Sequence, residues 1–286
     1  MRQDFRNTVL ITAAELKAAR SAGTLLSILA VRSEDSSCSR PFSEAPRIPG
    51  ALDTSMELHF AAPSHPQNGV RPLPNLKQLE HTIQKLGLNR QDAIVVYDHD
   101  GNLQAARVWW VLRWAGFKTV FMLDGGFQAW ATAGFPISHT EPPPPASSNE
   151  MIEPGNLPQL DADSAAFLGR NGILIDSRIA PNFKGGITPA GASRRGHIPG
   201  AHNIPAPDNL TADGFFRDLD TLRAQYAAIG ADGSRPVGVY CGAGVSAAHD
   251  VAVLMMLGIE APMYPGSWSA WISDPERPVE IGDKLC

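Results

Sequence analysis

One cysteine of this sequence lies in a local pattern of residues that is typical of a nucleophile. Cys241 follows the apolar run Val237–Tyr240 and precedes the loop Gly242-Ala243-Gly244-Val245-Ser246, after which a helix is expected. Two glycines within four residues let the backbone curl tightly, so several N–H groups are expected to point inward at the sulfur. The helix adds its unsatisfied N–H groups and the positive end of its dipole. Such an environment stabilises thiolates, and Cys241 is therefore predicted to be a nucleophile at neutral pH.

Three other interpretations of this cysteine remain open. A lone cysteine at a strand end is often a small buried apolar residue. A cysteine-dependent phosphatase uses a similar loop, but it needs an arginine after five spacer residues, and this chain has Ala247 there. A non-catalytic module that binds sulfur or senses redox state is the third alternative.

The remaining candidate ligands do not form a metal site. Cys38 and Cys286 are far from Cys241 and from each other, and none of the three belongs to a CxxC pair. The eight histidines lack a ligand spacing such as HxxxH. We expect no metal, no disulfide framework and a reducing, cytoplasmic environment.

The elements around the cysteine occur twice in the chain. Three sequence matches follow one another in the same order in both copies, which indicates an internal duplication. The matched pairs are Ile48–Ala51 with Ile198–Ala201, Ile94–Asp98 with Val237–Cys241, and Leu123–Trp130 with Tyr264–Trp271. Asp98 therefore occupies, in the first copy, the position of Cys241.

Strand and helix signals alternate in each copy. Helices are expected after the Thr12/Glu15 capping box and at Leu76–Leu86, Leu103–Ala115, Leu222–Ile229 and Ser246–Leu257. Strands are expected at Leu25–Val31, Ile94–Tyr97, Thr119–Met122, Ile173–Ile175, Val237–Tyr240 and Ala261–Tyr264. This alternation predicts an α/β protein with two tandem domains, each a mainly parallel sheet flanked by helices. Ligands of such sheets bind beyond the carboxyl ends of the strands.

A proline run separates the two copies. Pro142–Pro145 favours an extended, stiff connector because consecutive prolines continue neither a helix nor a sheet. We predict an inactive N-terminal domain over residues 1–140, a proline-rich linker over 141–157 and a catalytic C-terminal domain over 158–286.

Composition restricts the partners. The chain has 286 residues and a net charge of −5, which disfavours nucleic acid as the main partner because phosphate binding requires a basic surface. Its first residues lack an apolar run of signal-peptide length, and no stretch is long and apolar enough to cross a bilayer. Neither a membrane nor a nucleic acid is expected as a partner.

Together these motifs resemble the rhodanese family of sulfurtransferases over nearly the whole chain. The resemblance rests on Asp176-Ser177-Arg178, Gly196–Ala201, the cysteine loop and Gly266–Trp271. It implies an inactive first domain and a catalytic second one, whose cysteine takes a sulfur from a small donor as a persulfide. The persulfide then passes its outer sulfur to cyanide, a thiol or a thioredoxin-like acceptor, without a cofactor. The loop is most similar to that of the 3-mercaptopyruvate branch, and thiosulfate is the other donor considered.

The chain departs from this branch at its substrate-binding positions. Two arginines that would hold a carboxylate are replaced by Asn182 and Ala190, and the loop serine by Ala243. The first-domain histidine and aspartate of the branch have no match, and the corresponding region carries Arg71. The basic side chains nearest to the missing arginines are taken as substitute candidates: Arg178, Lys184, Arg194 and Arg195.

Overall fold

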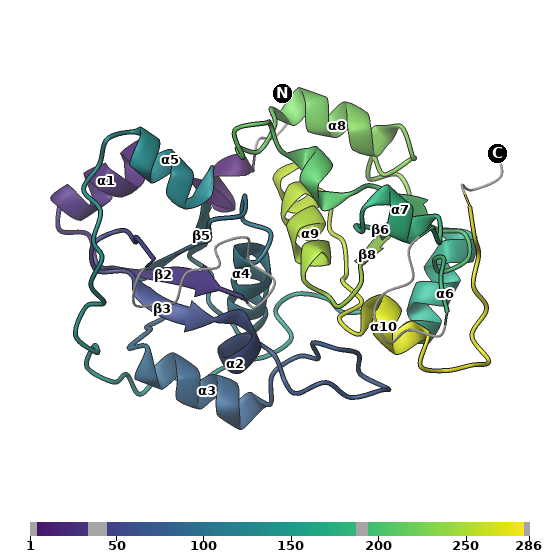
Figure 1. Cartoon of the computed structure of the whole chain (residues 1–286), viewed down its shortest axis with the longest axis horizontal. Coiled ribbons are helices and arrows are strands. Elements are labelled where there is room, and N and C mark those ends of the chain that lie inside the picture. Colours follow the sequence, from purple (N-terminus) through teal and green to yellow (C-terminus); the bar gives the residue numbers. More distant parts are fainter. Residues whose placement is uncertain (1–4, 34–44, 187–193, 283–286) are drawn as a thin grey trace.

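The computed structural model describes residues 5–33, 45–186 and 194–282, which form two α/β halves side by side (Figure 1). Every strand pair in both sheets is parallel. The first sheet has the order β1 (Leu10–Ile11), β5 (Val120–Leu123), β4 (Ala93–Tyr97), β2 (Leu26–Arg32), β3 (Leu52–Ser55). The second has the order β7 (His202–Asn203), β6 (Ile173–Asp176), β8 (Val237–Tyr240). The predicted fold class is confirmed.

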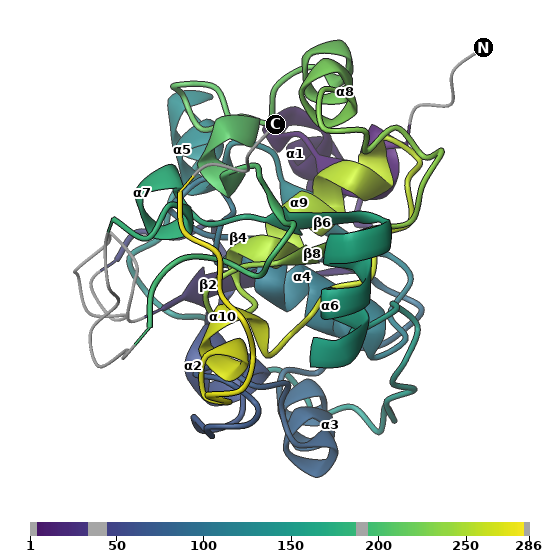
Figure 2. The same cartoon turned by 90° about the vertical axis from the view of Figure 1, so that its right-hand side faces the viewer.

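Helices cover both faces of each sheet. In the first half these are α1 (Ala13–Ser21), α2 (Met56–Phe60), α3 (Leu76–Lys85), α4 (Ala105–Trp114) and α5 (Gly126–Thr132). In the second half they are α6 (Ala162–Asn171), α7 (Ala180–Phe183), α8 (Leu219–Ala227), α9 (Ser246–Met256) and α10 (Ser267–Trp271), with short 3-10 turns at Arg6–Thr8 and Ala206–Asn209. Figure 2 views the second half from its outer side, with α6 and α10 in front of its strands.

Alternation along β2 explains how one strand serves two faces. Ile28 and Ala30 pack with α1 and α5, whereas Leu29 and Val31 pack with α2, α3 and α4. Successive side chains of a strand point to opposite faces, so a sheet covered on both sides needs an almost continuous apolar run. The predicted capping box is also present, because Thr12 and Glu15 each bond the backbone N–H of the other.

The strand expected at Ala261–Tyr264 is reduced to isolated bridges. Met263 makes single parallel bridges to Val239 and to Gln159, and no strand is assigned there. Pro262 directly precedes this residue, and Pro265 follows it two positions later. Because proline has no N–H to donate, the ladder cannot continue in either direction.

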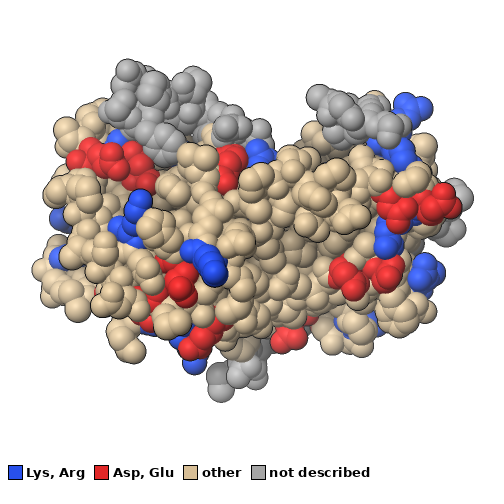
Figure 3. Space-filling model, turned by 90° about the horizontal axis from the view of Figure 1, so that it is seen from below, with Lys and Arg blue, Asp and Glu red and all other residues tan. Residues whose placement is uncertain are grey.

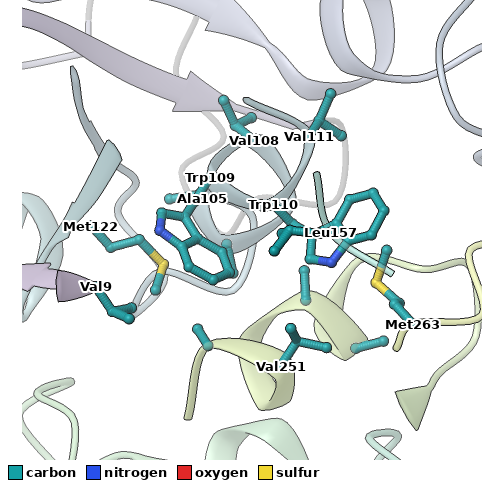
Figure 4. Close-up of a cluster of buried hydrophobic side chains, with 14 of the residues drawn as sticks. Val9, Ala105, Val108, Trp109, Trp110, Val111, Met122, Leu157, Val251 and Met263 are labelled. Atoms are coloured by element: carbon teal, nitrogen blue, oxygen red, sulfur yellow. The ribbon is translucent and has the colours of Figure 1, made fainter. Parts of the chain in front are cut away.

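The two halves share one apolar core. α4 of the first half packs on α9 of the second, and Trp109, Trp110 and Val251 belong to the same buried cluster (Figure 4). Each of these helices directly follows the loop at the end of a strand. The loop before α4 contains Asp98, and the loop before α9 contains Cys241. Their contact therefore fixes each loop against the opposite half.

The face in Figure 3 has a broad central zone without charged side chains, and its acidic and basic groups lie mainly to the sides. Among the described residues, no helix combines the length and apolarity that a membrane crossing needs. The same residues contain no cluster of three or more His, Cys, Asp or Glu side chains suited to a metal ion.

Candidate active site

Cys241 lies at the carboxyl end of β8, and its sulfur is held by the loop that follows. The Gly244 N–H donates a hydrogen bond to Cys241 Sγ at 3.0 Å. Gly244 has φ +74°, and a Cβ at this position would lie 2.5 Å from the Pro265 carbonyl oxygen. Only glycine satisfies both constraints, so the loop has its curled form because position 244 has no side chain.

Ser267 is a second contact of the cysteine, which the sequence did not single out. Its hydroxyl oxygen accepts a hydrogen bond from Cys241 N at 3.1 Å, donates to the Tyr264 carbonyl at 2.9 Å and lies 3.9 Å from Sγ. Ser267 has φ +53°, which is unusual for a residue other than glycine. The duplication held a signal for it, because the matching residue of the first copy is Gly126, with φ +57°. A serine at a glycine position marks strain that is retained at functional sites.

A cavity of about 840 Å³ opens over the cysteine between the two halves. Cys241 is only 1% exposed and forms part of its wall. The second half contributes the loop residues Gly242, Ala243, Val245 and Ser246, and also Ser177, Arg178, Ile179, Asn182, Pro207, Trp268, Ser269 and Ile272. The first half contributes Val70, Arg71, Leu103 and Gln104. Neither half encloses the cavity without the other.

Arg178 brings a cation to this cavity but is held by other groups. Its guanidinium forms a bidentate ion pair with Asp176, donates to the Gly196 carbonyl at 2.8 Å and lies 4.7 Å from the Trp268 ring centroid. Burial opposes its charge, but the Asp176 carboxylate raises the pKa of Arg178 above its ordinary value. Such a pair is chiefly structural.

The other three basic candidates do not line the cavity. Arg194 donates to the carbonyls of Asp274 and Arg277, whereas Lys184 and Arg195 are exposed on the surface. Ala190 lies outside the described residues, as do Cys38 and Cys286. The second cation in the cavity wall is Arg71 of the first half, which pairs with Glu57 at 3.2 Å.

The first copy has a carboxyl group at the position where the second copy has its thiol. Asp98 is 1% exposed, and its carboxylate accepts hydrogen bonds of 2.8–2.9 Å from a cradle of four backbone N–H groups, those of Asp100, Asn102, Gln104 and Ala105. Around Cys241 Sγ, the described residues supply one such N–H, that of Gly244, instead of the several expected. A carboxylate has two oxygens that accept several bonds each, whereas a thiol is a weaker and single acceptor.

A buried polar cluster supports α9 behind the loop. Asp250 accepts a 2.6 Å hydrogen bond from Asn209 and is fully buried, and burial raises the pKa of Asp250 to about 7 although hydrogen bonds oppose the shift. His249 stacks on Phe216, and burial lowers the pKa of His249 to about 3. His249 is therefore neutral at physiological pH.

Comparison with known proteins shows the family to which this two-domain architecture belongs. A model of the rhodanese-like domain matches the chain twice, over residues 12–133 and 161–274. The chain belongs to the rhodanese family. SseB of Mycobacterium tuberculosis, named as a thiosulfate sulfurtransferase, is 39% identical over 97% of this chain and 98% of its own length. A Pseudomonas aeruginosa protein named as a 3-mercaptopyruvate sulfurtransferase is 37% identical over 96% and 98%.

The solved structures agree with this assignment. The crystal structure of YnjE is 25% identical, has a TM-score of 0.83 and matches 96% of this chain and 68% of that one. Relatives this similar over almost the full length identify this rhodanese as a sulfurtransferase. Since the two relatives carry the names of different donors, they leave the donor of this rhodanese to be argued from its own cavity.

Proposed function

We propose that this rhodanese moves a sulfur atom from a small anionic donor to a thiol or cyanide acceptor through a persulfide on Cys241. The observation that carries the proposal is the position of Cys241 Sγ, which lies in the wall of the cavity and accepts the Gly244 N–H. That N–H stabilises negative charge on sulfur before and after transfer. The division of labour between an inactive first domain and a catalytic second domain belongs to the same proposal, because Asp98 cannot form a persulfide.

The two half-reactions balance without an external oxidant. With thiosulfate, the Cys241 thiolate attacks the outer sulfur, the S–S bond breaks and sulfite leaves with its electron pair. With 3-mercaptopyruvate, the thiolate attacks the thiol sulfur, the C–S bond breaks and the departing enolate takes up a proton to give pyruvate. In the second half-reaction an acceptor thiolate or cyanide attacks the outer persulfide sulfur and returns the Cys241 thiolate.

We favour 3-mercaptopyruvate as the donor. The loop has no basic residue beside Cys241, and the cations at the cavity, Arg71 and Arg178, are both paired with carboxylates. A single carboxylate is easier to place in such a cavity than the dianion thiosulfate. A physiological acceptor of the thioredoxin type and a reducing, cytoplasmic location agree with a catalytic thiol that must stay free.

Intact-mass measurement tests the proposal. Incubation with either donor should add one sulfur atom to the wild-type chain, and cyanide should remove it. The Cys241→Ser variant should gain none, whereas Cys38→Ser and Cys286→Ser should behave as the wild type. If the folded wild type gains no sulfur from either donor, the non-catalytic sulfur-binding or redox-sensing alternative is supported instead. Turnover rates measured side by side with 3-mercaptopyruvate and thiosulfate show which of the two is the better donor.

A further inference from the structure

An arginine of the inactive half contacts the cysteine loop of the other half. Arg107 lies on α4, is fully buried and donates through Nη1 to the Gly244 carbonyl at 3.0 Å. Its Nη2 donates to the carbonyls of Arg71 and Pro72 at 3.2 and 3.3 Å. The guanidinium therefore joins α4, the segment before α3 and the catalytic loop.

Arg107 is a buried cation without a carboxylate partner among the described residues. All its hydrogen bonds go to neutral carbonyls, and its Nε has no partner. Burial lowers the pKa of Arg107 to about 10, the negative charge of Cys241 favours the protonated form, and Arg71 opposes it. The arginine remains charged at neutral pH. An unpaired buried charge is costly, and an anion formed on the Cys241 sulfur would offset it.

Gly244 connects this cation to the nucleophile. Its N–H donates to Cys241 Sγ, and its carbonyl oxygen accepts from Arg107. The N–H and the carbonyl of Gly244 belong to two successive planar peptides that meet at its Cα, so the backbone dihedrals of Gly244 set their relative orientation. By anchoring the Gly244 carbonyl, Arg107 restrains the loop conformation at φ +74°, in which the Gly244 N–H faces the sulfur.

We propose that Arg107 is a positioning residue through which the inactive half completes the active site of the other half. It anchors the Gly244 carbonyl, restrains the loop there, and supplies positive charge that favours the thiolate and the persulfide anion. The inference rests on Cys241 being the nucleophile. It gives the first half a direct role in the reaction that goes beyond enclosing the cavity.

Other charged and titratable groups face this region and must be separated from Arg107. Arg178 follows β6 and is paired with Asp176, and Arg71 precedes α3 and is paired with Glu57. On α9 itself, His249 and Asp250 are buried behind the loop, and Ser267 contacts the sulfur from α10. Substituting Arg107 leaves all these groups in place.

The test measures the rate at which iodoacetamide alkylates Cys241 as a function of pH. In Arg107→Gln the midpoint should rise by about one pH unit, because a neighbouring opposite charge shifts a titration by that order. Arg107→Met should behave alike, and Arg107→Lys should stay near the wild type. Arg113→Gln is the matched control, because Arg113 is on the same helix and bonds the Lys118 carbonyl and Met255 instead.

Equal midpoints in the wild type and the neutral variants would overturn the proposal. If both neutral variants fail to fold, Arg107→Lys decides. This variant keeps the positive charge but loses the guanidinium that bridges three carbonyls. If it forms the persulfide about tenfold more slowly at an unchanged melting temperature, the positioning role of Arg107 is supported. Persulfide formation at the wild-type rate contradicts that role. Alkylation needs no sulfur donor, so a shifted midpoint without persulfide formation in the wild type would refute only the proposed function.

Discussion

Replacing Asp98 with alanine tests whether the first copy of the duplication uses this position for stability and not for chemistry. The substitution leaves the backbone N–H groups of Asp100, Asn102, Gln104 and Ala105 without their acceptor in a loop that is buried or half-buried. We expect the fold to lose stability and the chemistry at Cys241 to continue, because Asp98 belongs to the other loop.

The magnitude follows from the number of lost partners. A buried N–H without an acceptor costs about 1–3 kcal/mol, but water entry and loop relaxation recover part of the total. Burial itself raises the pKa of Asp98, so the native carboxylate already has a desolvation cost that the variant avoids. Removing one member of a buried charged network typically costs about 3–5 kcal/mol, which we take as the net loss. For a chain of this size that corresponds to a melting temperature lower by roughly 10 °C.

Differential scanning calorimetry and single-turnover persulfide formation provide the two readouts. Asp98→Ala should melt well below the wild type and form the persulfide within about twofold of its rate at 25 °C. Asp98→Asn should fall between, because one oxygen still accepts while its NH₂ faces two donors. Asp213→Ala, on an exposed residue, is the control. A melting temperature of Asp98→Ala within about 2 °C of the wild type would refute the stabilising role of the cradle.

Three further predictions concern the loop and its support. Burial raises the pKa of Asp250 to about 7, so the contribution of this carboxyl to stability is complete below its unfolded pKa near 4 and is lost as pH rises to about 7. Denaturant midpoints of the wild type should therefore fall between these two pH values, whereas those of Asp250→Asn should stay constant. Parallel curves of midpoint against pH for the two proteins would contradict this. Gly244→Ala places a Cβ 2.5 Å from the Pro265 carbonyl oxygen, so stopped-flow measurement should show persulfide formation about 100-fold slower, and a wild-type rate would exclude the strain argument. Ser267→Ala removes the hydroxyl that accepts the hydrogen bond of the Cys241 N–H, so the alkylation rate of Cys241 should fall about tenfold. An unchanged alkylation rate would show that Ser267 is only a packing residue.

The sequence determined the features that depend on neighbours along the chain. The duplication, the strand β8, the loop after it and the helix α9 were all predictable from apolar periodicity and glycine placement, because these act through local backbone geometry. The Thr12 capping box was predictable for the same reason. The proposal of Cys241 as the nucleophile rests on the same kind of local feature, its place between a buried strand and a glycine-containing loop.

The tertiary structure decided which distant segments meet at that loop. Ser267 is 26 residues from Cys241 and Arg107 is 137 residues from Gly244, yet both contact the loop because α10 and α4 pack beside it. Packing also places Arg71 at the cavity, while Arg194 bonds carbonyls elsewhere. The burial of apolar helix faces sets these long-range contacts, and no local pattern encodes which charged side chain ends beside the sulfur.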